Sequence, residues 1–148
     1  MGRARILARG PSAVHFGGVY MERVTRSSGY QVLQRALALG SDADAEATLA
    51  HKQLELTRSA RSKQHGLQRA QLTSQHAFRC ECSYRAIVAI IGEYRARLDL
   101  DARLAAAMRM IVDCAREDAR AATVDAEHAL ELARALPFSA TDANASCA

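Results

Sequence analysis

Apolar residues recur at alternating steps of three and four in the second half of the chain, from Tyr84 to Leu136. The series consists of Tyr84, Ile87, Ile91, Tyr94, Leu98, Ala105, Met108, Val112, Ala115, Ala119, Ala122, Ala126, Ala129, Ala133 and Leu136. This spacing is typical of helices that pack side by side in a coiled coil. Asp101 interrupts the series, and either Asp99 or Asp101 can cap a new helix. The pattern therefore predicts two helices joined by a bend at residues 98–102.

A test of side-chain size favours a chain that folds back on itself at this bend. Residues that face each other across the two helices then have numbers that add to about 199, as Tyr94 and Ala105 or Ile87 and Val112 do. In this register bulky residues mostly face small or medium ones, as close packing requires. We predict an all-α fold, an elongated antiparallel helical hairpin that forms a coiled coil, with a short extra N-terminal helix.

Proline and glycine divide the rest of the chain. Residues 1–18 carry three arginines and four glycines and no acidic residue, and we expect a disordered basic arm there. Residues 19–136 form the predicted helical domain, and Pro137 begins a tail, residues 137–148, that is expected to be disordered. Gly40, followed by the possible caps Ser41 and Asp42, predicts a helix boundary that ends the short first helix.

The helix that starts at Ala43 has two possible forms. Its apolar seam is expected to run through Leu49, Leu56, Ala60, Leu67, Ala70 and Ala77. It either continues to Leu98 without a break or bends at residues 62–66, and the bend would convert the hairpin into a bundle. The spacing is compatible with both forms.

The composition favours an elongated protein over a thick globular one. Only 5% of the 148 residues are aromatic and there is no Trp, and alanine buries little surface per residue. The apolar run at residues 86–91 is far shorter than the ~20 residues of a membrane-spanning helix. The four cysteines do not form a disulfide framework and no secretory signal is visible, so we expect a cytoplasmic protein without a membrane span.

Two clusters were considered as metal sites. His76 and Cys80 are four residues apart, with Cys82 nearby, but a structural zinc needs four ligands. The preferred interpretation has Cys80 filling a small slot of the seam and His76 exposed to solvent. The second cluster is a stripe of Asp125, His128 and Glu131, which lacks the further ligands of a di-metal site and is interpreted as an exposed face.

The sequence offers no basis for enzymatic chemistry. It contains no recognisable nucleophile motif and no glycine-rich phosphate loop. We therefore predict a protein that is not an enzyme and that needs no cofactor and no metal.

Charge is distributed unevenly along the predicted hairpin. Residues 49–79 carry six basic residues and one acidic residue, so 6 − 1 = +5, whereas residues 101–134 carry five basic and seven acidic residues, so 5 − 7 = −2. Antiparallel docking lays the acidic arm along the basic one, and such pairs set orientation more than stability.

Part of the basic arm is the predicted partner-binding surface. Its residues are Arg58, Arg61, Lys63 and Arg69. A protein partner is the first interpretation of this row. One alternative is a nucleic acid, whose phosphates the row would neutralise, although no aromatic residue lies between Tyr30 and Phe78 to stack on bases. The other alternative is a small homodimeric helical scaffold.

A cytoplasmic chain of this size, rich in Arg and Ala and folded as a long antiparallel hairpin, resembles the central stalk proteins of bacterial type III secretion and flagellar export. The resemblance covers residues 19–136 and rests on size, architecture and charge. It implies a helical adaptor in protein transport that works through protein–protein contacts. The implied partners are a hexameric export ATPase, into which the coiled coil projects, and the export gate or chaperones.

Overall fold

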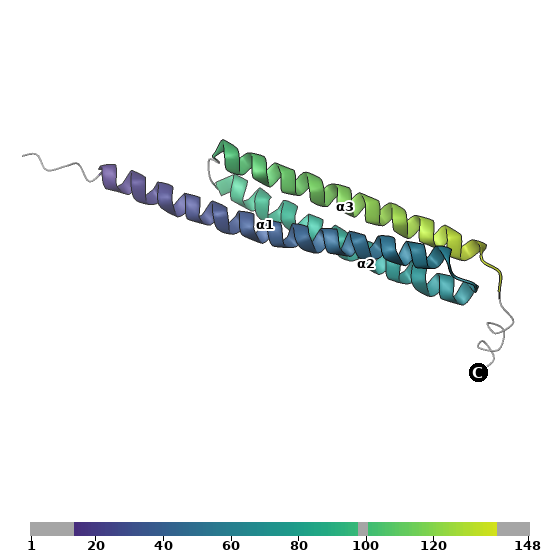
Figure 1. The fold of residues 1–148 in the computed structure, drawn as a ribbon. Coiled ribbons are helices and arrows are strands. Elements are labelled where there is room, and N and C mark those ends of the chain that lie inside the picture. Colours follow the sequence, from purple (N-terminus) through teal and green to yellow (C-terminus); the bar gives the residue numbers. More distant parts are fainter. Residues whose placement is uncertain (1–13, 98–100, 139–148) are drawn as a thin grey trace, which may run out of the picture.

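The protein is a rod of helices that pack side by side (Figure 1). The structure, a computed structural model, describes residues 14–97 and 101–138, with side-chain surroundings for residues 28–95 and 101–138. Within these residues the helices are α1 (Val14–Arg58), α2 (Lys63–Arg97) and α3 (Ala102–Ala135), and each packs against the other two. The prediction of an all-α fold is confirmed.

The bend between α2 and α3 lies where the interrupted heptad series predicts it. α2 ends at Arg97 and α3 begins at Ala102. Asp101 caps α3, because its Oδ1 accepts a hydrogen bond of 3.0 Å from the backbone N–H of Arg103. This satisfies one of the N–H groups that the first turn of a helix leaves without an internal partner. The other predicted cap, Asp99, lies outside the described residues.

The predicted register of this hairpin is confirmed at its far end. A Cβ atom added to Gly66 would lie 3.3 Å from the Cα of Ala133, and the residue numbers 66 and 133 add to 199. Beside this pair, the backbone N–H of Lys63 donates a hydrogen bond of 3.2 Å to the carbonyl of Pro137. The α2–α3 hairpin therefore has the predicted register at this end.

A second bend makes the molecule a three-helix bundle. α1 ends at Arg58 and α2 begins at Lys63, so the break falls at residues 59–62. Ser62 caps α2, since its Oγ accepts a hydrogen bond of 3.3 Å from the backbone N–H of His65. Of the two forms left open by the sequence, the structure adopts the bent one. Gly66 itself lies in the first turn of α2.

The predicted boundary at Gly40 is wrong, and with it the short extra N-terminal helix. α1 runs through Gly40, Ser41 and Asp42 without a break and is 45 residues long, against 35 for α2 and 34 for α3. Glycine inside a helix costs only about 1 kcal/mol relative to alanine. Here packing outweighs that cost, because one face of α1 contacts both other helices over many turns.

On each helix one set of buried positions repeats every seven residues. On α1 they are Gly29, Ala36, Ala43, Ala50 and Thr57. On α2 they are Gly66, Thr73, Cys80, Ile87 and Tyr94, and on α3 they are Met108, Ala115, Ala122 and Ala129. The core is therefore a coiled-coil seam shared by three helices.

The predicted seam of residues 49–77 is correct at Ala70 and Ala77, which are buried, but wrong at its leucines. Leu49 and Leu56 on α1 and Leu67 on α2 are 39%, 37% and 41% exposed, whereas Ala50, next to Leu49, is buried. Small residues face the core because three helices meet there at close range. These three leucines lie beside the buried positions, whereas Leu54 is itself buried.

The core differs between the two ends of the rod. In the tip half (residues 28–43, 80–95 and 101–118) it contains bulky side chains such as Ile87, Ile91, Met108 and Ile111. In the turn half (residues 44–79 and 119–138) it consists mainly of small ones. Its buried members there include Ala70, Ala77, Ala119, Ala122, Ala129, Ala133, Thr57 and Thr73, with Leu54 as the largest apolar side chain.

α1 is longer than the hairpin that it covers. A Cβ atom on Gly29 would meet Tyr94 near the end of α2 and Leu104 near the start of α3, so Gly29 lies level with the tip of the hairpin. Residues 14–27 of α1 continue past that tip (Figure 1). At ~1.5 Å per residue this overhang is roughly 20 Å long.

The outer ends of α1 and α3 lie near the predicted domain limits. α1 begins at Val14, inside the predicted arm of residues 1–18, and α3 ends at Ala135 with Leu136 as its C-cap and Pro137 next. Residues 1–13 and 139–148 lie outside the described residues. Among the helices described, none has a stretch long and apolar enough to span a bilayer.

Candidate functional site

The four predicted partner-binding residues do not form one exposed row. Arg58 and Arg61 are exposed beside the α1–α2 turn. Lys63 is half-buried, with its Nζ 4.4 Å from the centre of the Phe138 ring. Arg69 is half-buried two turns further on, and its Nη1 donates a hydrogen bond of 3.2 Å to Oε1 of Gln53 on α1. Their role in binding a partner stays a prediction, and Arg58 and Arg61 are the two best placed for it.

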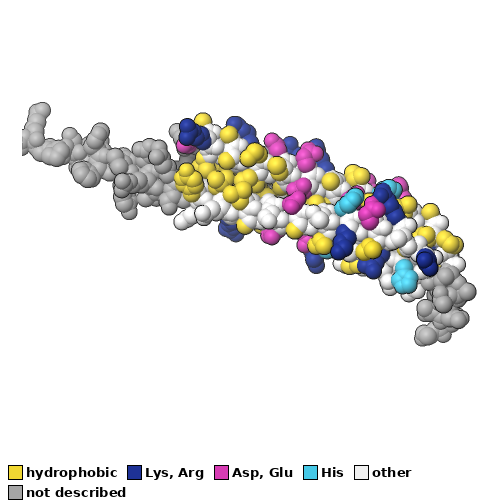
Figure 2. All heavy atoms as spheres, in the orientation of Figure 1, with side chains coloured by type: hydrophobic (Ala, Val, Ile, Leu, Met, Phe, Trp, Pro, Cys, Tyr) yellow, Lys and Arg dark blue, Asp and Glu magenta, His cyan; other side chains and the backbone are white. Residues whose placement is uncertain are grey.

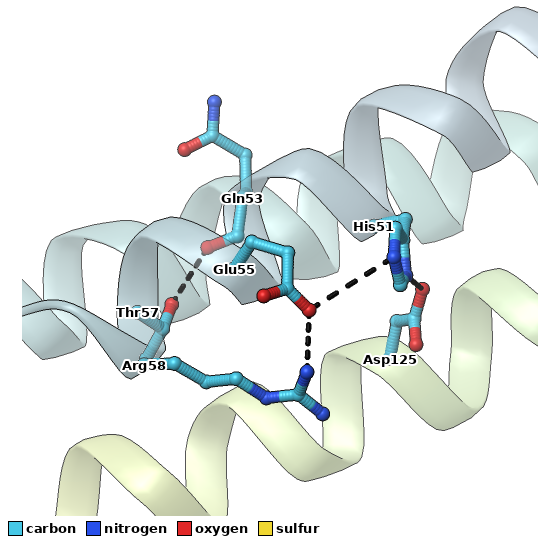
Figure 3. A network of polar contacts seen from close by, with 6 residues as sticks. All are labelled: His51, Gln53, Glu55, Thr57, Arg58 and Asp125. Carbon is cyan, nitrogen blue, oxygen red and sulfur yellow. Dashed lines mark hydrogen bonds and ion pairs between the residues drawn. The ribbon is translucent and has the colours of Figure 1, made fainter.

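A polar network next to the turn joins α1 to α3 (Figure 3). His51 Nδ1 lies 3.1 Å from Oδ2 of Asp125, and its Nε2 lies 3.9 Å from Oε1 of Glu55. Glu55 also accepts a hydrogen bond from Arg58. Pairs as exposed as Arg58 and Glu55 contribute roughly 0–1 kcal/mol each, so the network mainly fixes how the helices are oriented.

The acidic partners of the basic α2 segment differ from the prediction. In the part of the chain that the structure describes, Glu46 on α1 forms ion pairs with α2, where it contacts His76 at 2.6 Å and Arg79 at 3.8 Å. On α3, Asp125 contacts His51 of α1. These ion pairs therefore join α1 to each of the other two helices and do not pair α2 with α3 directly.

The first candidate metal cluster is part of the α1–α2 interface. Cys80 is fully buried in the seam, as predicted, and donates a hydrogen bond of 3.2 Å to the carbonyl of Ala43. The interpretation of His76 as solvated is wrong, because its side chain is only 14% exposed and pairs with Glu46. Burial, helped by Asp118 and Glu46, raises the pKa of Cys80 to about 11, so its thiol stays protonated and unreactive at neutral pH.

The second cluster is only partly an exposed face. Glu131 is exposed, but Asp125 is 19% exposed and contacts α1 through His51. Within the described residues, no three His, Cys, Asp or Glu side chains lie close enough together to hold a metal ion.

In the part of the chain that the structure describes, an apolar groove lies between α1 and α3. Nearest the tip it is a hollow of about 500 Å³ lined by Tyr30, Leu33, Leu104 and Ala107, with Asp101 and Arg103 at its edge. The next turns of the same two helices line a second hollow of about 480 Å³. Its residues are Leu37, Gly40, Ser41, Asp44, Met110, Ile111, Cys114, Ala115 and Asp118. We call the two hollows together the α1–α3 groove.

Large apolar side chains in this groove are exposed. Tyr30 is 62% exposed, Leu37 53% and Met110 65%. Figure 2 shows apolar side chains gathered over α1 and α3 near the hairpin tip, whereas charged side chains are more numerous toward the other end. Single exposed apolar residues are ordinary on protein surfaces, but a contiguous group marks a contact surface.

The inner end of the groove is acidic. Asp44 on α1 and Asp118 on α3 both line it. Burial raises the pKa of the Asp118 carboxyl, and Asp44 and then Glu117 raise it further by repulsion. A positively charged group placed at this end of the groove would relieve that repulsion.

Sequence reasoning missed the groove, although a signal for it exists. Tyr30 and Leu37 directly follow the buried small residues Gly29 and Ala36, so a second apolar stripe lies one position beside the seam. The leucines of α1 were placed in the core, which left this stripe without a role.

No protein-family model, curated protein or solved structure matches this chain.

Proposed function

We propose that this protein is a helical adaptor that works by binding other proteins, and that the α1–α3 groove is its main docking surface. The observation that carries the proposal is the exposure of Tyr30, Leu37 and Met110, each more than half accessible on adjoining faces of two helices. Burying one such side chain contributes roughly 1.5–3 kcal/mol, so three together can drive association.

The shape of the groove suits an amphipathic helix. Five of the residues that α1 contributes follow one another at steps of three or four, namely Tyr30, Leu33, Leu37, Gly40 and Asp44, and Ser41 lies next to Gly40. The residues of α3 follow the same spacing, so two parallel stripes lie next to each other. A partner helix lying between such stripes presents side chains at the matching helical spacing, and it completes a four-helix arrangement.

The test of this proposal compares partners recovered by three forms of the tagged full-length protein. The wild type and Phe78→Glu should recover the same proteins, because Phe78 is 69% exposed on α2, away from the groove. The double variant Leu37→Glu with Met110→Glu should lose them. Equal recovery by all three forms would refute the docking role of the groove. Helical content measured by circular dichroism confirms that each variant is folded.

The narrower form of the proposal is a stalk-type adaptor of a type III export ATPase. It rests on the family resemblance and on the α2–α3 hairpin, and its test is co-purification with such an ATPase. The basic residues can be tested in the same experiment with the charge reversals Arg58→Glu and Arg61→Glu, which change exposed side chains at the turn. Arg69 is left unchanged because it bonds to Gln53 across the α1–α2 interface.

A further inference from the structure

We propose that the occupant of the α1–α3 groove is a second copy of this chain, which inserts the overhanging residues 14–27 of its own α1. This inference rests on the proposed docking role of the groove and names the partner. The two copies are related by a two-fold axis near the hairpin tip, so each overhang fills the groove of the other chain.

The length of the overhang matches the length of the groove. The overhang covers 14 residues, from Val14 to Ser27. The groove begins at Tyr30 and ends at Asp44 along α1, which is a similar span, so each is roughly 20 Å long at ~1.5 Å per residue. If the two-fold axis passes near residue 27, the two copies of α1 run antiparallel. Residue 14 of one copy then lies level with residue 40 of the other, and residue 24 lies level with residue 30. The helix would thus end where the apolar lining gives way to acidic residues.

The overhang needs a partner to stay helical. It lies beyond the ends of α2 and α3, and most of the stability of a helix in water comes from packing of an apolar face. The sequence of this segment has Phe16, Tyr20 and Val24 at four-residue steps, which is the spacing of one helix face. The same chain thus has a helix with apolar residues that extends beyond α2 and α3, and an apolar groove of similar length. The two can bind each other.

Charge favours the same direction of docking. In the antiparallel arrangement the residues that precede Val14 are directed toward the inner end of the groove, where Asp44 and Asp118 lie. Those preceding residues include Arg3, Arg5 and Arg9 and no acidic residue. Opposite charges therefore meet, which selects the orientation of the two chains.

The docked helix would complete a four-helix bundle at the tip half. α1 and α3 run parallel in this bundle and α2 runs against them, since Gly29 lies level with Tyr94 and Leu104. The partner's overhang would lie antiparallel to α1 and α3 and fill the space between them, as in an ordinary four-helix bundle. Each half of the dimer would then bury Tyr30, Leu37 and Met110.

The first test is the mass of the full-length protein by light scattering after size-exclusion chromatography. We expect twice the 16.1 kDa of one chain. Leu37→Glu and Tyr20→Glu should each give a monomer, because a charge in the groove or on the overhang breaks both symmetric contacts. Phe78→Glu is the matched control and should stay dimeric. A monomeric wild type, or a dimer that survives Leu37→Glu together with Met110→Glu, would overturn the inference.

A mixing experiment separates this interface from any other dimer. The Leu37→Glu chain keeps its overhang, and the Tyr20→Glu chain keeps its groove. Mixed together, they can form one intact overhang–groove contact, so a heterodimer should appear at high protein concentration although each variant alone is monomeric. Absence of that heterodimer, with both variants folded by circular dichroism, would contradict the proposed contact.

The outcomes also separate this inference from the broader proposal. A monomeric protein whose recovered partners are lost with the groove variant would support the adaptor and refute the dimer. A dimer held by the groove, with no other protein recovered, would support the dimer and refute the adaptor.

Discussion

The tip half and the turn half of the bundle use the same three helices but pack them differently. In the tip half the core holds Ile87, Ile91 and Met108, whereas in the turn half it holds mainly alanine and threonine. A Cβ atom on Gly29 would meet only the ends of the Leu104 and Tyr94 side chains, but one on Gly66 would also lie 3.3 Å from the backbone Cα of Ala133. The distance between packed helices depends on the side chains at their contact. Small core residues therefore let the helix backbones approach closely in the turn half. In the tip half the bulky core residues hold the helices further apart, and the groove lies between α1 and α3.

The largest effect is expected from removing a bulky core residue in the tip half. Ile87→Ala should lower the free energy of unfolding by about 2–5 kcal/mol, because Ile87 is fully buried and its loss leaves a cavity. Urea denaturation at a single protein concentration measures the change. Its control is Val88→Ala at a position that is 43% exposed, where the change should stay near 0.5 kcal/mol. A loss below that of the control would mean that the tip half is not held by its bulky core.

The opposite change should harm the turn half. Ala129→Leu adds volume at a fully buried position between closely packed helices, and we expect a loss of about 1–3 kcal/mol. Ala121→Leu, on the exposed side of α3, is the control and should be nearly neutral. If Ala129→Leu stabilises the protein in urea denaturation, the helices around Ala129 are not closely packed.

Replacing one glycine by alanine in each half tests how much room each half has for an added methyl group. A Cβ atom on Gly92 in the tip half would meet nothing within 4 Å, so Gly92→Ala should stabilise the protein by about 0.5–1 kcal/mol. Gly66→Ala gains the same propensity but forces its Cβ against Leu136 and Ala133. We expect it to be less stabilising than Gly92→Ala, or destabilising, in thermal unfolding. Equal gains at both sites would show that the backbones in the turn half can move apart at little cost.

The smallest effect concerns Asp118, at the boundary of the two halves. Its pKa in the folded protein is raised by burial and by Asp44, so the folded state holds this proton more tightly than the unfolded state. The charged carboxyl therefore lowers stability at neutral pH, and that penalty disappears as the pH falls through the raised pKa. Asp118→Asn should stabilise the protein near neutral pH, and its advantage over the wild type should shrink in acid. Urea unfolding at neutral and at acid pH measures the difference in unfolding free energy between the variant and the wild type. A difference that grows in acid would contradict the raised pKa of Asp118.

The hairpin was predictable because its signals are local. Asp101 interrupts a strict heptad series and offers a cap, and both features are read from a few neighbouring residues. The register followed from the position of the bend, and side-chain size agreed with it, since the bulky residues of α2 mostly face small or medium residues of α3. Gly66 opposite Ala133 confirms that alignment.

The groove and the course of α1 were not predictable by the same means. Gly40 followed by Ser41 and Asp42 is a good helix boundary when neighbouring residues alone decide. Leu49 and Leu56 are equally good core residues by hydrophobicity, yet Ala50 is buried in their place. Both errors arise because α1 packs against two helices at once. These contacts favour small residues on the buried face of α1 and stabilise its helical conformation through Gly40.

The sequence by itself determined that the chain is helical, where the α2–α3 bend lies and how those two helices align, because spacing, capping and side-chain size act over short distances. Only the tertiary structure decided that α1 is one long helix, that alanines rather than leucines face the core, and that an apolar groove remains between α1 and α3. These outcomes depend on how closely three helices approach one another, and that distance is set by all of their contacting residues together.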